Sequence, residues 1–300
     1  MTATVADLVE RLEPELGAAE GDPVALDGGI TNRNYRIRLG GVDYVLRIAG
    51  KNTGLLGIDR ETERRATQAA AEAGAAPAVA AFLEDAGCLV TRFVSGHPLE
   101  AAELRSPKVR AQLARSLRAV HAGPPLPTAF SPWERGRAYR AEAQARGVPV
   151  PADAATAAAI AERVEAALEG AEPAPCHNDL MVANFIAGDE RVWIVDWEYA
   201  GMGDRFYDLG NLAEKAAFSE DEETALLKAY LDAAPDAAAL ARLRLSRLAT
   251  AYFEGMWGVI QRGLSDLDFD FAGYTTEHLD RVRELAADPR FERWLEDARA

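Results

Sequence analysis

Apolar and polar residues alternate along the first third of the chain, with the period of two that is typical of β-strands. Residues 34–50, "NYRIRLGGVDYVLRIAG", carry two such runs joined by Gly40 and Gly41, which is a strong signal for a β-hairpin. Residues 77–94 carry two more strand-like runs. The charged stretch between these pairs, 58–74, has helical character and ends at a glycine. These patterns predict a small antiparallel sheet with one helix.

Helical patterns dominate the rest of the chain. Ser106 followed by Pro107 marks the beginning of a helix, because serine caps helix N-termini and proline suits the first helical position. The alanine-rich segment 153–170 is another predicted helix, whose alanines indicate helix propensity and surface positions. Long helices are predicted from Asp208 to the C-terminus, and two short strand-like segments precede them.

This change of pattern predicts an α+β fold with two lobes. The N-terminal lobe, residues 1–95, is rich in β-strands, and the C-terminal lobe, residues 96–300, is mostly helical. A short hinge is expected near Ser95 and Gly96, because the strand pattern ends there.

Charge excludes one class of ligand. The chain of 300 residues has 48 acidic and 33 basic residues, for a formal net charge of −15. This balance argues against binding of nucleic acid, whose phosphates need a basic surface. It is compatible with a cationic ligand, since an acidic surface raises the local concentration of cations, although acidic surfaces also simply keep proteins soluble.

Cysteine content and hydropathy bear on the cellular compartment. Cys88 and Cys176 have no metal-site or disulfide-framework spacing, which favours a reduced, cytoplasmic protein. No run of 18 uncharged apolar residues occurs, so no membrane-spanning helix is expected. The N-terminus lacks a basic segment followed by an apolar run, so a signal peptide is not expected; residues 5–16 show helical spacing instead.

Polar residues interrupt the apolar segment "CHNDLMVANFI" at residues 176–186. Asp179 and Asn184 are five residues apart, and Asp196 follows twelve residues later at the end of another apolar run. A carboxylate in such a place is costly to bury unless it binds something, and Mg²⁺ prefers oxygen ligands. The order His177, Asp179, Asn184, Asp196 matches the catalytic and metal motifs of protein kinases. Taken singly, each residue is better explained by ordinary structure, with Asp179 and Asn184 as turn formers and Asp196 at the start of a loop. All four in this order, behind a β-rich half, favour a catalytic site.

The segments "HNDLMVANFI" and "IVDWEYAGMGDRFYDLGNL" resemble the choline/ethanolamine kinase family, within the aminoglycoside-phosphotransferase-like small-molecule kinases. "GGITNRNYRI", "YVLRIAG" and "YFEGMWGVIQRGLSDLDFDFAGY" extend the resemblance over nearly the whole chain. It implies a bilobal, protein-kinase-like fold and transfer of phosphate from ATP, with Mg²⁺, to a hydroxyl of a small molecule. Asp179 would be the base, Asn184 and Asp196 the Mg²⁺ ligands, and His177 a brace of the catalytic loop.

The segment "LDGGITNRNYRI" is the predicted phosphate loop. Backbone N–H groups at Gly28 and Gly29 could approach the phosphates, with Thr31 and Asn32 as further donors. The segment lacks GxGxxG, so an ordinary hairpin turn is the alternative.

Arg47 stands where protein kinases have their phosphate-contacting lysine, and its planar fork suits phosphate. Glu63 is its predicted helix partner and Glu61 is a close competitor, unless both belong to a solvated charged face of the helix. The resemblance further implies that backbone groups at residues 92–94 contact the adenine. Glu198 matches an acidic residue of the family, with a surface charge as an equal alternative.

The acceptor site is predicted near the C-terminus, where Tyr252, Trp257 and Tyr274 could form an aromatic wall for a cation. An aromatic core stripe is the alternative, and acidic residues at 266–270 favour the wall. Glu254 stands where the family tends to place a tryptophan. Because a carboxylate can pair with a primary ammonium, this departure favours ethanolamine or another amino alcohol over choline.

Three functions remain open from sequence. The first is a kinase of a small cationic amino alcohol, and the second is a kinase of the same fold acting on an aminoglycoside, thiamine or a sugar. The third is a pseudokinase that binds nucleotide without catalysis. The presence of all three catalytic-motif residues, Asp179, Asn184 and Asp196, argues against the third.

Overall fold

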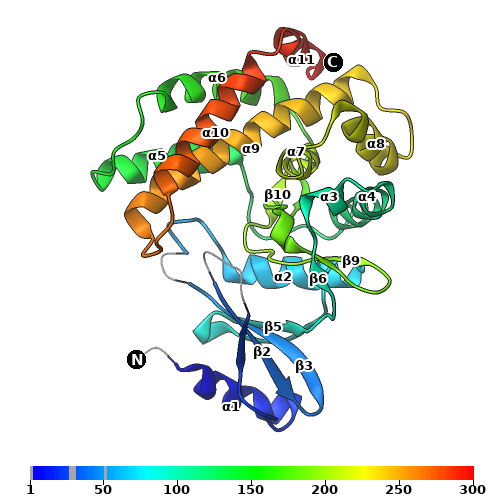
Figure 1. The fold of residues 1–300 in the computed structure, drawn as a ribbon, viewed down its shortest axis with the longest axis vertical. Coiled ribbons are helices and arrows are strands. Elements are labelled where there is room, and N and C mark those ends of the chain that lie inside the picture. The colour runs from blue at the N-terminus through cyan, green and yellow to red at the C-terminus, as the bar shows by residue number, and fades with distance from the viewer. Residues whose placement is uncertain (1–2, 27–31, 51–52) are drawn as a thin grey trace.

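The computed structural model describes residues 3–26, 32–50 and 53–300. In the described N-terminal part, five strands form one antiparallel sheet in the order β1-β2-β3-β5-β4, with two helices beside it (Figure 1). These elements are α1 (Val5–Leu16), β1 (Val24–Leu26), β2 (Arg33–Leu39), β3 (Val42–Ile48), α2 (Arg60–Glu72), β4 (Val79–Leu83) and β5 (Cys88–Arg92).

The predicted hairpin is confirmed as β2 and β3. Leu39 pairs with Val42 at its tip, and the two residues between them have positive φ angles: 55° at Gly40 and 79° at Gly41. Positive φ at both turn positions fits the twist of the flanking strands, which is why glycine occupies them. On one face of the sheet, Leu46 and its neighbours pack against Leu8 and Leu12 of α1 in a core of their own.

The C-terminal part is mostly helical, as predicted, and also contains short strands. Its helices are α3 (Ala101–Leu104), α4 (Pro107–His121), α5 (Pro132–Ala145), α6 (Ala154–Leu168), α7 (Arg205–Lys215), α8 (Glu220–Leu231), α9 (Ala237–Leu264), α10 (Phe271–Ala286) and α11 (Phe291–Asp297). Its strands are β6 (His97–Pro98), β7 (Ala174–Cys176), β8 (Phe185–Ala187), β9 (Val192–Ile194) and β10 (Gly201–Gly203). Strands β6, β8 and β9 form one small sheet, and β7 pairs with β10.

Local sequence explains where helices begin, but not always which face is buried. Ser106 caps α4 by accepting a hydrogen bond from the backbone N–H of Val109, as its position predicts. In α6 the prediction of surface alanines is confirmed for Ala155, Ala159 and Ala166, which are exposed, but it is wrong for Ala157 and Ala161, which are buried. These small side chains pack in the same core as α5, α9 and α10, where a larger residue would find little room.

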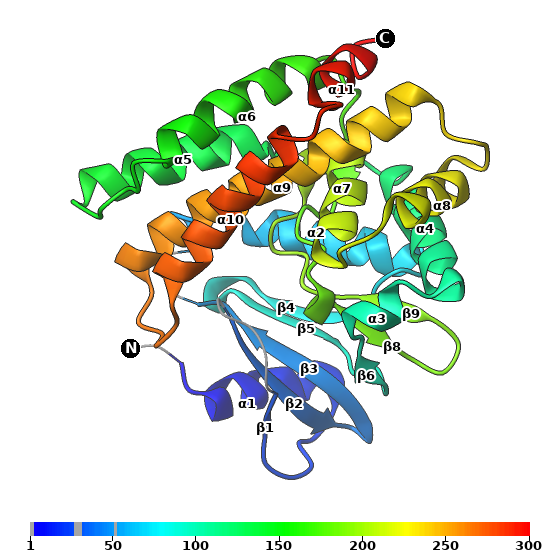
Figure 2. The same ribbon diagram turned by 45° about the horizontal axis from the view of Figure 1, so that its top comes forward.

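Helix α2 lies between the sheet and the helical part in both views (Figures 1 and 2). The predicted boundary at residues 95 and 96 falls between β5 and β6, and β6 pairs with β8 of the helical part. The loops that follow β7 and β9 carry the catalytic motif. Within the described ranges, no helix is both long and apolar enough to cross a bilayer.

Candidate active site

The loop after β7 is held in place by Asp208, a fully buried residue of α7. Its carboxylate accepts hydrogen bonds from the backbone N–H groups of His177, at 2.8 Å, and Asn178, at 2.7 Å. Asn178 has a φ of 66°, in the left-handed region that only a few non-glycine residue types tolerate. These hydrogen bonds to the carboxylate therefore fix a strained turn directly before Asp179.

Asp208 is a residue to which sequence reasoning gave no role. His121, at the end of α4, lies between the hydroxyl of Tyr230, at 2.8 Å, and the Asp208 carboxylate, at 3.0 Å. Although burial acts to raise it, the pKa of Asp208 is held below its usual range by the hydrogen bond and charge of His121. The available signal was an acidic residue within the apolar helical stretch "FYDLGNL", which is costly to bury without partners.

His177 braces this loop as a neutral imidazole. Its Nδ1 accepts a hydrogen bond from the backbone N–H of Asp179, at 3.2 Å, so Nε2 carries the proton and donates it to the carbonyl of Val195, at 3.0 Å. Its ring also packs on Trp197, with centroids 4.5 Å apart. Burial lowers the pKa of His177, which favours this uncharged form. The side chain thus links the loop after β7 to the loop after β9.

Asp179, Asn184 and Asp196 come together where these two loops meet. The Asn184 side-chain nitrogen donates to the carbonyl of Asp179, at 2.9 Å, which turns its amide oxygen away from that carbonyl. Asp196 has a φ of 67°, again in the left-handed region. A carboxylate and an amide oxygen are hard donors of the kind that Mg²⁺ takes, so the donor set fits this ion.

Asp179 lies in a buried and mostly anionic environment. Burial raises the pKa of its carboxyl well above the usual range, and the negative charges of Glu254 and Asp196 act in the same direction. The positive charge of Lys215 opposes them. A carboxylate whose pKa is raised binds a proton more tightly than an ordinary carboxylate does.

Arg47 lies at the centre of a cluster of carboxylates. Its Nη1 is 3.0 Å from Glu63, and its Nη2 contacts Asp196 and lies 3.3 Å from Glu198. Glu61 instead pairs with arginines of its own helix. The helix partner of Arg47 is therefore Glu63, and the alternative of a wholly solvated charged face is wrong for this residue, which is 3% exposed.

Glu198 belongs to the same cluster and is only 4% exposed, so a surface charge is the wrong interpretation. It accepts a hydrogen bond from the side chain of Asn32, at 2.9 Å, and lies 3.4 Å from Arg60. Glu198 therefore lies beside Arg47, and its predicted role among the acceptor residues stays a prediction. The predicted phosphate-loop residues Gly28, Gly29 and Thr31 lie outside the described residues.

A cavity of about 410 Å³ opens between the sheet and the catalytic loops. Arg47, Asn184 and Asp196 line one part of it. Its apolar walls come from both lobes, and the predicted adenine-contacting segment, residues 92–94, lies along it. Other lining residues are Leu26, Val45, Leu89, Ile186 and Trp197. An apolar slot that ends at an arginine and two hard oxygen donors suits a nucleotide.

The aromatic residues of α9 and α10 do not all meet. Trp257 and Tyr274 are in edge contact, with ring centroids 5.7 Å apart, and Phe269, which is 46% exposed, lies 5.9 Å from Tyr274. The Trp257 indole N–H donates to the hydroxyl of Tyr199, at 3.2 Å. These side chains form a wall with one edge open to solvent.

Tyr252 is absent from this wall, which corrects the prediction that it approaches Trp257 and Tyr274. It packs on Trp133 of α5, with centroids 6.1 Å apart, and a Cβ on Gly136 would lie 2.5 Å from its ring. Residues five positions apart on an α-helix point about 140° away from each other, so Tyr252 and Trp257 face different neighbours.

Glu254 is already paired within the protein. Lys215 of α7 places its ammonium 2.6 Å from one carboxylate oxygen, and the Tyr274 hydroxyl donates to the other at 2.6 Å. Although burial acts to raise it, the pKa of Glu254 is held below its usual range by Lys215 and then by Tyr274. Glu254 therefore has two partners within the protein, and its predicted contact with the ammonium of the acceptor stays a prediction. Lys215 is a residue that sequence reasoning missed.

The sequence and the fold of this chain are similar to those of known proteins. Residues 23–245 match the profile of the family described as phosphotransferase enzyme family. The chain is 27% identical over 212 residues to protein LicA of Haemophilus influenzae, covering 69% of this chain and 62% of that protein, less than two thirds of its length. It is 25% identical over 326 aligned residues to ethanolamine kinase 1 of Mus musculus, covering 93% of this chain and 87% of that protein.

Over nearly the whole chain, the fold is similar to the crystal structure of a choline/ethanolamine kinase family protein from Mesorhizobium loti. The TM-score is 0.84 at 29% identity, and the match covers 98% of both chains. The predicted bilobal, protein-kinase-like fold is confirmed by this similarity.

Proposed function

Because the chain belongs to the phosphotransferase enzyme family, we propose that it transfers the γ-phosphoryl group of ATP to a hydroxyl of a small cationic amino alcohol related to choline or ethanolamine. The observation that carries this proposal is the convergence of Asp179 with Asn184 and Asp196, two residues that line a nucleotide-sized cavity. The names of the similar kinases support the acceptor class.

Asp179 is the proposed base. The acceptor oxygen bonds to the γ-phosphorus, the bond from that phosphorus to the bridging oxygen breaks, and ADP leaves with that bond's electron pair. The proton of the hydroxyl passes to the Asp179 carboxylate. Catalysis of this kind consists mostly of positioning and charge stabilisation, so a rigid loop is required. Asp208 and His177 supply that rigidity through bonds to the backbone of residues 177–179.

Asn184 and Asp196 are the proposed Mg²⁺ ligands. When bound, the ion would neutralise phosphate charge. The side chain of Asn184 is already oriented by its bond to the Asp179 carbonyl. The carboxylate of Asp196 also forms an ion pair with Arg47, so the proposed phosphate-binding arginine and the proposed Mg²⁺ ligand are in direct contact.

Arg47→Lys is expected to raise the KM for ATP and to lower turnover, each by about 10-fold or more, since one charge-assisted hydrogen bond contributes about 1.5–3 kcal/mol. The guanidinium of Arg47 contacts Glu63 through one terminal nitrogen and Asp196 through the other. The single ammonium of a lysine cannot reproduce this geometry. Steady-state kinetics test this, with Arg36→Lys on the neighbouring strand as the control. Unchanged constants in Arg47→Lys would make this strand merely structural.

Trp257→Leu is expected to raise the KM of the acceptor by about 2- to 30-fold, the equivalent of a cation–π contact of about 0.5–2 kcal/mol. The KM for ATP should change by less than about twofold, because Trp257 lies in the wall of α9 and α10 and does not line the nucleotide cavity. Trp294→Leu, in α11, is the matched control for loss of a buried tryptophan. Parallel rises in both Michaelis constants would contradict the assignment.

The proposed function as a whole is tested by ADP production with a panel of acceptors: choline, ethanolamine, an aminoglycoside and an uncharged sugar. Turnover of one or both amino alcohols is expected, together with little turnover of the sugar. Exclusive turnover of the aminoglycoside or the sugar would move the protein to another acceptor class. Nucleotide binding without turnover of any acceptor would leave a pseudokinase.

A further inference from the structure

A buried ion pair joins three helices beside the proposed acceptor wall. Lys215 ends α7, Glu254 lies in the middle of α9, and Tyr274 belongs to the first turn of α10. The side chains of Lys215 and Glu254 are 12% and 6% exposed, and their charged atoms are 2.6 Å apart. Burying a charge is costly unless it is paired, so this contact is a fixed feature of the protein interior beside the wall rather than a surface encounter.

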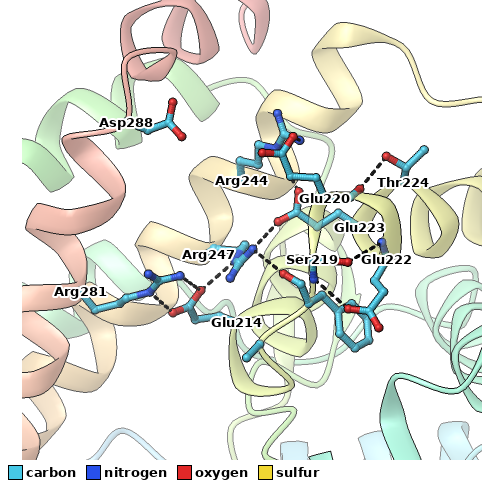
Figure 3. A network of polar contacts seen from close by, with 12 residues as sticks. Glu214, Ser219, Glu220, Glu222, Glu223, Thr224, Arg244, Arg247, Arg281 and Asp288 are labelled. Atoms are coloured by element: carbon cyan, nitrogen blue, oxygen red, sulfur yellow. Dashed lines mark hydrogen bonds and ion pairs between the residues drawn. The ribbon is translucent and has the colours of Figure 1, made fainter. Parts of the chain in front are cut away.

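A second set of ion pairs fixes the end of α7 independently of Lys215. Glu214, the preceding residue, contacts Arg247 of α9 at 2.8 Å and Arg281 of α10 at 2.5 Å (Figure 3). Arg247 also contacts Glu223 of α8. These ion pairs hold the end of α7, and a change of the Lys215 side chain leaves them in place.

The ion pair connects the surroundings of the base to the aromatic wall. Both Glu254 and Lys215 act electrostatically on Asp179, the proposed base. Tyr274, which donates to Glu254, is in edge contact with Trp257. An acceptor whose hydroxyl reaches Asp179 and whose nitrogen lies on the wall therefore has this pair as a neighbour.

The contacts of Glu254 leave neither of its oxygens without a partner, since Lys215 holds one and Tyr274 the other. A primary ammonium has three N–H donors and loses free energy when they are buried without acceptors. A trimethylated ammonium has no such donors and is stabilised by aromatic faces alone. With Lys215 in place, the acceptor site offers aromatic faces but no free carboxylate oxygen of Glu254, which suits a trimethylated ammonium.

We propose that Lys215 determines the amine specificity of the acceptor site: it holds Glu254 in the place of a substrate ammonium, so that the pocket selects N-methylated over primary amino alcohols. This inference rests on the proposed function, since it names the acceptor of that same site. Removal of Lys215 should free one oxygen of Glu254 and shift the preference toward primary amino alcohols.

The test compares kcat/KM for choline and ethanolamine in the wild-type protein and in Lys215→Met. The wild-type protein is expected to favour choline. In Lys215→Met the ratio is expected to shift toward ethanolamine by about tenfold, the worth of roughly one net hydrogen bond to a charged group. A shift of threefold or more supports the proposal, and a smaller shift, or a wild-type preference for ethanolamine, overturns it.

Two further variants keep the test decisive if Lys215→Met does not fold. Glu254→Gln retains Lys215, so both kcat/KM values should fall together and the ratio should stay within threefold of wild type. Selective loss of ethanolamine turnover in Glu254→Gln would show that the substrate uses this carboxylate and would overturn the proposal. In the double variant Lys215→Met with Glu254→Gln, the gain for ethanolamine should disappear, because the freed carboxylate is gone.

Binding separates this inference from the proposed function. Calorimetric titration of choline and ethanolamine into the same four proteins, in the presence of a non-hydrolysable ATP analogue, measures amine preference without turnover. If the wild-type protein phosphorylates neither alcohol, the proposed function is wrong, while the binding ratio still supports or overturns the role of Lys215 by the same threefold criterion.

Discussion

Asp179→Asn is expected to lower turnover by about 10²–10⁴-fold, the contribution typical of one general base, while the fold and nucleotide binding remain. The contacts that hold the loop are made by the backbone of Asp179, whose N–H donates to His177 and whose carbonyl accepts from Asn184. An asparagine keeps both backbone contacts and removes only the ability to take a proton. The nucleotide cavity is lined by other residues.

The measurement is steady-state release of ADP with the preferred acceptor, together with calorimetric titration of ATP and circular dichroism. Asp189→Asn is the matched control, because Asp189 is an exposed aspartate in the turn between β8 and β9. Turnover of Asp179→Asn close to that of the wild-type protein would remove Asp179 from the role of base. Loss of both nucleotide binding and secondary structure would instead indicate that the variant is misfolded.

Asp196→Asn is expected to lower turnover by about 10²–10³-fold, comparable to the loss of one electrostatic stabiliser of a transition state. It removes a formal negative charge that would face a dication, and asparagine tolerates the left-handed φ of 67° at this position. Asn184→Ala removes only a neutral group from the proposed Mg²⁺ site, so its effect on Mg²⁺-dependent nucleotide binding should be smaller.

Calorimetric titrations of ATP with and without Mg²⁺ test this order. The Mg²⁺-dependent gain in affinity should be lost in Asp196→Asn and reduced in Asn184→Ala, whereas binding without Mg²⁺ serves as the internal control. A full Mg²⁺-dependent gain in both variants would show that the ion is held elsewhere.

Features that depend on residues adjacent in the chain, such as turns, helix caps and motif spacing, are predictable from sequence. Gly40 and Gly41 predict the hairpin because few other residues take positive φ, and Ser106 predicts the beginning of α4 because its hydroxyl caps the helix locally. The spacing of Asp179, Asn184 and Asp196 predicts their convergence, because a short loop and a strand end limit where each can lie. These features follow from local geometry and do not depend on how distant segments pack.

Which side chains contact each other across different elements depends on the tertiary structure and is not predictable from local sequence. Glu61 and Glu63 both suit Arg47 by position, and the burial of one face of α2 against the active site selects Glu63. Tyr252 and Trp257 look alike in sequence, yet helical geometry turns Tyr252 toward α5. Lys215 and Glu254 are 39 positions apart in the sequence, and the packing of α7 on α9 makes them an ion pair at 2.6 Å. Pairing of charges depends on distance in space and on desolvation, and neither is set by local sequence.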